Sequence, residues 1–339
     1  MIPKILIIPP GIEGGWYMEN HAEYLIRELS DEFFIEVADV PYPPYDDFLD
    51  RFPETNPFQR NPDDYDLLWP LLPTHWVVTD KDKYAHKTAT VFYQPNEGRF
   101  QDVAVVGAAN PKAYKELSDT NTKYFKLRFG VDINHFKPLL HKREDDLLHV
   151  GMVGNLYNPR RMVPDVVEVL KDVYGIKIML FLNQAPQTDH DIDLLGGAKN
   201  VKYIVSGSKG WAGLPNLYNR LDVLIRCDSD PGVSFPVMEA AACGVPVIAT
   251  DSGIDHIITE AGGGYLIKGD RSYYQSNPTE VAEKVREHVI YFRDHPVERL
   301  KMGIKARLEI ITNWTWEDQI LEWREFFREG IKNASYQKN

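Results

Sequence analysis

Cysteine is nearly absent from this chain of 339 residues, and no apolar run approaches the ~20 residues that a helix needs to cross a bilayer. The two cysteines, Cys227 and Cys243, stand in apolar contexts without metal-ligand spacing, which favours a reducing compartment over a disulfide between them. No cluster of metal-ligating residue types is seen, so no metal is expected. The first residues are more typical of a buried strand than of a signal peptide. These absences predict a cytoplasmic protein.

Positive charge is scarce in one part of the sequence. The formal net charge is −12, and residues 31–82 alone hold 13 acidic side chains against three basic ones. Such a surface repels both nucleic-acid phosphates and anionic lipid head groups. Nucleic acid is therefore not expected as a partner, and neither is a stable association with a membrane. A charged face that only maintains solubility explains the same pattern.

The chain is long enough for two domains, since single domains cluster at roughly 100 to 200 residues. Short apolar runs alternate with helical patterns, which predicts an α/β fold with parallel sheets. The expected strands span residues 4–8, 34–38, 89–93, 103–106, 147–153, 177–182, 201–205, 223–225 and 245–249.

Three other segments have distinctive patterns. Prolines and aromatic residues interrupt residues 41–73, which predicts a long irregular insertion that either packs as a loop or contacts a substrate. Asn277, Pro278 and Glu280 predict a helix with an N-cap, a proline in its first turn and a capping-box acid. A last helix is expected over about residues 315–331.

The most informative segment spans residues 228–253. A strand ends in a loop at residues 232–234, and a helix starts near Phe235, so the loop amides and the positive end of the helix dipole offer a place for an anion. A diphosphate fits such a loop, and Glu239, one turn into the helix, can accept hydrogen bonds from a ribose diol. An ordinary strand-to-helix turn with a surface glutamate explains the turn alone.

Three segments resemble the retaining glycosyltransferases of family 4, the glycosyl transferases group 1. Residues 231–253 are similar to the family's acid-x7-Glu motif, with Cys-Gly, a Pro-Val-Ile-Ala strand and a Ser-Gly loop after it. Residues 129–138, Phe-Gly-Val-Asp-Ile-Asn-His-Phe-Lys-Pro, resemble its Asn-Gly-Val-Asp…Phe-x-Pro segment. Residues 153–156, followed by Arg160, are a weaker match to the segment in which the family places an Arg and a Lys on the donor diphosphate.

This resemblance implies the GT-B fold, in which two doubly wound Rossmann-like domains face each other across a cleft and a C-terminal helix crosses back to the first. It implies an acceptor-side domain at residues 1–139, a donor-binding domain at 147–312 and the returning helix at 313–339. The implied reaction is the transfer of a sugar, with retention, from a UDP- or GDP-sugar to an unknown glycan or small-molecule acceptor. Neither a cofactor nor a metal is implied.

The resemblance also assigns residues to the site. The catalytic candidates are Arg160, Asp230 and Glu239. The donor-binding candidates are Gly14, Gly15, Asn155, Arg160, Arg161, Gly232, Val233, Ser234, Phe235 and Glu239. The acceptor-side candidates are Gln94, Asn96 and His75.

The sequence departs from the family pattern at two positions. Pro231 stands where the family has its first acid, and Asn155 stands where it has an arginine. Asp230 or Asp228 substitutes for that acid, or backbone amides contact the sugar instead. A catalytically impaired nucleotide-sugar-binding protein or accessory subunit is therefore an alternative, and so is a related epimerase or phosphorylase. A dehydrogenase is disfavoured because the loop at residues 11–15 lacks the G-x-G-x-x-G spacing.

Overall fold

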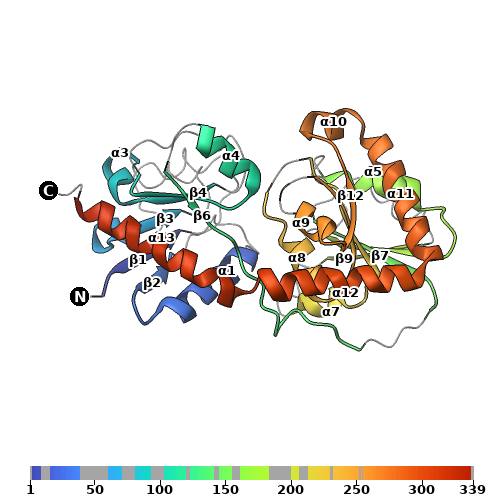
Figure 1. Ribbon diagram of the computed structural model, residues 1–339, viewed down its shortest axis with the longest axis horizontal. Coiled ribbons are helices and arrows are strands. Elements are labelled where there is room, and N and C mark those ends of the chain that lie inside the picture. Colours follow the sequence, from blue (N-terminus) through green and yellow to red (C-terminus); the bar gives the residue numbers. More distant parts are fainter. Residues whose placement is uncertain are drawn as a thin grey trace. The chain divides into compact units, whose positions relative to one another are not determined.

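The computed structural model divides into two compact units, residues 1–130 with 316–339 and residues 131–315 (Figure 1). Each unit is an α/β structure with parallel strands, as the sequence predicts. The described residues are 2–8, 16–38, 60–70, 81–92, 103–119, 123–140, 145–154, 161–182, 200–205, 213–229, 232–251, 253 and 255–336.

The first unit holds two three-stranded parallel sheets, in the orders β2-β1-β3 and β4-β5-β6. An isolated parallel bridge between Leu68 and Thr88 connects them. The strands are β1 (Lys4–Ile8), β2 (Phe34–Val37), β3 (Leu67–Pro70), β4 (Ala89–Phe92), β5 (Val105–Ala108) and β6 (Phe125–Lys126). The helices are α1 (Trp16–Leu29), α3 (Lys81–Tyr84), α4 (Pro111–Asp119) and α13 (Trp316–Tyr336), with short 3-10 helices η1 (Pro62–Asp64) and η3 (Ala85–Lys87).

Strand β3 corrects one prediction. Residues 41–73 were expected to be irregular throughout, but residues 67–70 form a fully buried strand that pairs with β1. Of the prolines that suggested interruption, the two that the structure describes lie at the ends of regular elements. Pro62 occupies the first turn of η1, where its missing N–H has no intrahelical partner to lose, and Pro70 is the last residue of β3.

Helix α13, the last helix of the chain, packs on the strands of the first unit (Figure 1). It contacts β3, β5 and β6 and also α1. Trp323 is fully buried; its indole N–H donates to the Arg128 carbonyl at 2.7 Å, and its ring lies 4.9 Å from that of Trp69. The predicted last helix is thus confirmed, and it continues five residues beyond its expected end.

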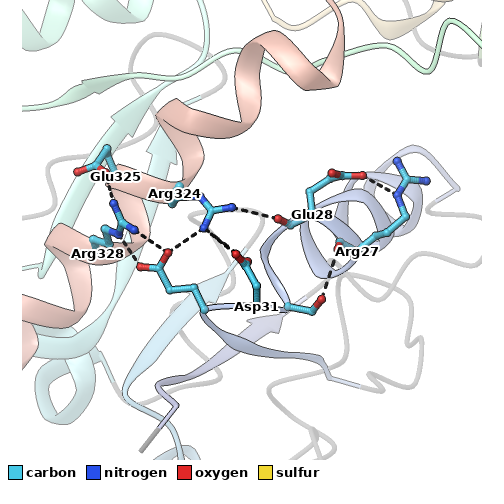
Figure 2. Close-up of polar contacts among 8 residues, drawn as sticks. Arg27, Glu28, Asp31, Arg324, Glu325 and Arg328 are labelled. Carbon is cyan, nitrogen blue, oxygen red and sulfur yellow. Dashed lines mark hydrogen bonds and ion pairs between the residues drawn. The ribbon is translucent and has the colours of Figure 1, made fainter.

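Ion pairs add to this packing, as Figure 2 shows. Arg324 and Arg328 on α13 extend toward the turn that follows α1. Arg328 donates to the Glu32 carboxylate at 2.5 and 2.7 Å, and Arg324 donates to Glu32 at 2.9 Å and to Asp31 at 3.4 Å. Hydrogen bonding from Arg328 is the main cause that lowers the pKa of Glu32. Part of the acidic N-terminal segment is therefore neutralised within the unit itself.

The second unit contains a six-stranded parallel sheet in the order β12-β11-β10-β7-β8-β9. Its predicted strands are confirmed to within two residues at each end. The strands are β7 (Leu148–Gly154), β8 (Ile176–Leu182), β9 (Val201–Val205), β10 (Val223–Arg226), β11 (Val247–Thr250) and β12 (Gly264–Ile267). The helices are α5 (Val163–Leu170), α7 (Leu214–Tyr218), α8 (Phe235–Ala242), α9 (Asp255–Glu260), α10 (Arg271–Ser276), α11 (Pro278–Asp294) and α12 (Pro296–Asn313).

The predicted capping box of α11 is wrong, although Pro278 does begin the helix. The Asn277 side chain donates backward to the Tyr273 carbonyl at 2.9 Å, since α10 ends immediately before it. Glu280 accepts from the Tyr273 hydroxyl at 2.8 Å and pairs with Lys284 at 3.0 Å. The side chain of an asparagine between two helices can therefore cap the carboxyl end of the first helix instead of the amino end of the second.

Two further observations concern the chain as a whole. Cys227 and Cys243 are buried and do not form a disulfide. Among the helices that the structure describes, none has the length and apolar character that would let it span a bilayer.

Candidate functional site: the switch point of the second sheet

The order of strands in the second unit determines where a ligand is expected. The chain runs outward from β7 to β8 and β9, then returns to β10 on the other side of β7 and continues to β11 and β12. Loops leaving the carboxyl ends of β7 and β10 therefore diverge. In open α/β sheets ligands bind in the crevice at such a switch point. The two turns that the sequence singles out, after residue 153 and after residue 226, leave these two strands.

The turn between β10 and α8 is held against its neighbour. Gly232 forms an isolated parallel bridge with Gly253, which follows β11. Gly253 has φ +132°, and a Cβ at this position would lie 2.1 Å from the Gly232 carbonyl oxygen. Only glycine therefore allows this approach of two backbones. Helix α8 begins at Phe235, as predicted, with Val233 and Ser234 immediately before it.

Two hydroxyl groups in this turn are buried without a recorded hydrogen bond. The side chains of Ser229 and Ser234 belong to residues that are only 3% and 2% exposed, and neither Oγ has a hydrogen-bond partner within the part of the chain that the structure describes. Ser234 is at the N-cap position, yet its side chain makes no cap bond. Buried polar groups are nearly always satisfied, so these hydroxyls and the free amino end of α8 together point to a polar ligand.

Glu239, one turn into α8, is buried with 8% exposure. Tyr218, at the end of α7, donates its hydroxyl to Glu239 Oε2 at 2.7 Å. Burial raises the pKa of Glu239 to about 7, against the opposing effect of the Tyr218 hydrogen bond. Burial also raises the pKa of Cys243, one turn further along, to about 12. The carboxyl group of Glu239 thus changes charge near neutral pH. Its two neighbours named here, Tyr218 and Cys243, are both neutral at that pH.

Arginines meet an aspartate at the same edge of the sheet. Arg226, the last residue of β10, donates to Asp228 Oδ2 at 2.6 Å, and Arg161 Nε lies 3.8 Å from the same oxygen. Arg161 also donates to the Val153 carbonyl of β7 at 3.3 Å. The main chain of Asp228 is bound to the Thr250 hydroxyl at 2.8 Å. Arg161 is therefore placed beside the switch point by contacts from both strands.

These contacts bear on the predicted site residues. Gly232, Val233 and Ser234 lie in the turn before α8, Phe235 and Glu239 lie in α8 itself, and Arg161 lies just before α5 and beside Asp228. Asp228, one of the suggested substitutes for the missing family acid, is already engaged by two arginines. The remaining predicted residues, Gly14, Gly15, His75, Gln94, Asn96, Asn155, Arg160 and Asp230, lie outside the described part of the chain.

Sequence reasoning missed Tyr218 and Arg226. A charged residue at the carboxyl end of an otherwise apolar strand was a usable signal for Arg226. Tyr218 gave none, because it stands 21 residues before Glu239 and the two meet only when α7 packs on α8. Within the described residues, no group of three or more His, Cys, Asp or Glu is placed to hold a metal ion.

Comparison with known proteins relates this site to a family. Residues 148–289 match the family model described as glycosyl transferases group 1. A segment of 87 residues, 25% of this chain, is 33% identical to the GDP-mannose-dependent monoacylated alpha-(1-6)-phosphatidylinositol monomannoside mannosyltransferase of Corynebacterium glutamicum. That match spans only 20% of the relative's length.

Solved structures resemble nearly the whole chain. Sucrose-phosphate synthase from Thermosynechococcus elongatus has a TM-score of 0.76 at 13% identity, over 96% of this chain and 98% of its own. HepE from Anabaena in complex with UDP-glucose has a TM-score of 0.69 at 16% identity, over 96% and 99%. At such identities the likeness shows the fold. The chain therefore has the α/β GT-B-like fold, with its C-terminal helix packed back on the first domain, and its residues 148–289 are similar to the glycosyl transferases group 1.

Proposed function

We propose that this protein is a glycosyltransferase that moves a sugar, with retention, from a nucleoside diphosphate sugar to an acceptor. The observation that carries the proposal is the β10–α8 turn at the switch point. There, two buried hydroxyls without a recorded partner among the described residues precede the amino end of α8, and the carboxylate of Glu239 lies one turn into that helix. We assign the donor to this turn and hence to the domain at residues 147–312.

The turn suits a pyrophosphate. The amides of Gly232, Val233 and Ser234 precede a helix whose dipole favours negative charge, and Arg161 is fixed nearby by Asp228. When the nucleoside diphosphate leaves, negative charge builds on its phosphate oxygens. Fixed positive groups stabilise this charge most when they are already in place, which favours the departure. By its family position, Arg160 acts with Arg161 on these oxygens.

Glu239 suits the ribose of the donor, since an ionised carboxylate accepts two hydrogen bonds and a ribose diol donates two. Its Oε2 is already bound by Tyr218. Asp230 or the backbone of the turn contacts the donor sugar, where Pro231 has replaced the family acid. The acceptor lies on the side of Gln94, Asn96 and His75, in the domain at residues 1–139.

Two relatives indicate two donor bases. The HepE structure holds UDP-glucose, and the Corynebacterium relative is named for GDP-mannose. We therefore propose a UDP- or GDP-sugar. The name of that relative also includes a lipid-linked sugar acceptor, but its match covers a fifth of the relative, and the acceptor is left open.

A second candidate function is nucleotide-sugar binding without turnover, which the replacement of the family acid by Pro231 favours. The two candidates differ in one measurement. An active transferase releases nucleoside diphosphate from its donor, at least by slow hydrolysis, and a binding protein is stabilised by the donor but leaves it intact. Epimerised donor, or sugar phosphate formed with free phosphate, would indicate a related enzyme class instead.

The proposal is tested by nucleotide binding and by one substitution. UDP, GDP and ADP are screened by thermal unfolding, where a ligand at 100 times its Kd stabilises the fold by about 2.7 kcal/mol. Glu239→Ala is expected to weaken nucleotide binding, and so to reduce that stabilisation, and to lower donor turnover at least 100-fold. Glu283→Ala is the control, because Glu283 is an exposed helical glutamate paired with Arg286 in the same unit. Failure of all three nucleotides to bind overturns the proposed function.

A further inference from the structure

Tyr218 and Glu239 form a buried pair in which only one carboxylate oxygen is used. The Tyr218 hydroxyl donates to Oε2 at 2.7 Å, and the tyrosine is 1% exposed. Within the described residues, Glu239 has no other recorded side-chain hydrogen bond. The Tyr218 hydrogen bond thus accounts for Oε2, and Oε1 is the carboxylate oxygen left to accept a hydrogen bond from a ligand.

The phenol is held in place independently of the glutamate. Its ring contacts Phe136, with ring centroids 6.1 Å apart. The next residue, Asn219, donates to the Lys137 carbonyl at 2.9 Å and accepts from the Leu139 amide at 2.7 Å. The end of α7 is thus fixed to residues 136–139 whatever the state of Glu239. A hydrogen-bond donor whose position is fixed before a ligand arrives selects one rotamer of the Glu239 carboxylate. This lowers the entropic cost when a ligand binds to that carboxylate.

The electrostatic surroundings fit a role in binding better than a role in stability. Burial raises the pKa of Glu239 to about 7, which means that its ionised form is disfavoured in the empty protein. An uncharged side chain of similar size would be more stable at this position. Tyr218 is the one recorded group that opposes the shift, since its hydrogen bond lowers the pKa of Glu239.

We propose that Tyr218 is a positioning residue for Glu239, which occupies Oε2 and so leaves Oε1 as the acceptor for a ribose hydroxyl of the donor. The inference rests on the proposed function, because the ribose belongs to the nucleotide sugar. The inference goes beyond the proposed function because it assigns a role to Tyr218, a residue that does not touch the nucleotide-sugar donor. The hydroxyl acts only through the carboxylate, which makes its effect separable from that of packing.

The pH dependence follows from the groups that face the pair. These are Cys243 at the end of α8, whose thiol stays neutral because burial raises its pKa, Arg226 of β10, which acts on Tyr218, and Arg307 of α12, which acts on Cys243. Donor binding needs the Glu239 carboxylate, so affinity is expected to rise with pH through about 7. Removal of the Tyr218 hydroxyl takes away a bond that lowers this pKa, and the rise should therefore move to higher pH.

The test is a comparison of Tyr218→Phe with a matched control, Tyr65→Phe. Tyr65 is also buried and also donates to a glutamate, Glu36, at 2.7 Å, but it lies in the first unit. The probes are UDP-glucose and GDP-mannose, whose esterified diphosphates do not titrate near neutral pH. Affinity is measured by calorimetry from pH 6 to 9. Tyr218→Phe is expected to weaken binding about tenfold at pH 7 and to move the pH profile upward, and Tyr65→Phe to change neither.

A double-substitution cycle separates positioning from folding. In a Glu239→Ala background, Tyr218→Phe should have no further effect on affinity, since its only route to the donor has been removed. An effect of equal size in both backgrounds, or a Tyr218→Phe protein with unchanged affinity and pH profile, overturns the positioning role alone. Failure of the wild-type protein to bind either probe overturns the proposed function first.

A second measurement covers a Tyr218→Phe protein that fails to fold. 3-Fluorotyrosine placed at position 218 retains the hydroxyl, and its ¹⁹F resonance reports on the state of the paired carboxylate. We expect the resonance to titrate near pH 7 and to shift when UDP-glucose or GDP-mannose binds. A resonance that responds to neither pH nor ligand, in a protein that binds the ligand, overturns the inference.

Discussion

The face of α13 in the first unit and the switch-point edge of the second unit both bury polar groups, but they do so differently. On α13, the Trp323 indole donates to a carbonyl, and Arg324 and Arg328 are bound by carboxylates of the same unit. At the switch point, the hydroxyls of Ser229 and Ser234 have no recorded partner. The region of α13 also holds buried polar atoms without a recorded partner among the described residues, Trp69 Nε1 and Glu322 Oε2, but at the switch point such atoms adjoin the amino end of a helix. A buried polar group without a partner indicates a binding site most clearly where other groups that attract a ligand stand beside it.

The largest expected effect concerns a buried titratable group of the structural kind. His21 lies between Phe129 and Trp316, with ring centroids 4.9 and 5.4 Å away, and burial lowers its pKa to about 3. The unfolded chain takes up a proton below about pH 6.5, whereas the folded chain does not until about pH 3. Stability is therefore complete above pH 6.5 and falls with pH, by up to about 5 kcal/mol.

Denaturant unfolding from pH 7.5 to 4 checks this loss. His21→Phe keeps an aromatic ring against the same neighbours and removes the titration, so its free energy of unfolding should fall less steeply with acid than that of the wild type. Equal slopes in the two proteins would show that His21 does not remain neutral in the fold.

A smaller effect of opposite sign is expected at the switch point. Ser234→Ala removes a buried hydroxyl that has no recorded partner, and should raise the free energy of unfolding by about 1 kcal/mol while it weakens nucleotide binding. Thr250→Val is the contrast, since the Thr250 hydroxyl is bound to the main chain of Asp228 at 2.7 and 2.8 Å. That change should destabilise the protein by about 1–3 kcal/mol. The comparison of the two regions fails if Ser234→Ala destabilises as much as Thr250→Val.

The smallest effect is expected in the ion-pair network of Figure 2. Arg328→Ala should lower the free energy of unfolding only slightly, because Arg328 is half exposed and water and salt screen its attraction to Glu32. The cost should decrease further between 0.05 and 1 M NaCl. The packing of Trp323, rather than the ion pairs, would then contribute most of the stability of α13 on the first unit. A loss that is large and independent of salt would contradict this.

The sequence allowed the parallel sheets, the β10–α8 turn and the helix start at Phe235 to be predicted, because each has a local signal. The prediction from sequence failed at β3, because prolines at the ends of regular elements resemble interruptions. It also failed at Asn277, whose side chain donates to a carbonyl of the preceding helix. The partners of Glu239 and Arg161 could not be predicted. They come from residues that are 21 and 67 positions distant in sequence, and only the packing of α7 and the strand order bring them together.

The place of α13 has a consequence for biosynthesis. The first unit is built from residues at both ends of the chain, so its core stays open at Trp69 and Phe129 until residues 316–336 have left the ribosome. The second unit, by contrast, is contiguous and has all of its strands available earlier. During translation, the part that emerges first is therefore completed last, and a chaperone that shields exposed aromatic surface has most to protect in the nascent amino-terminal half.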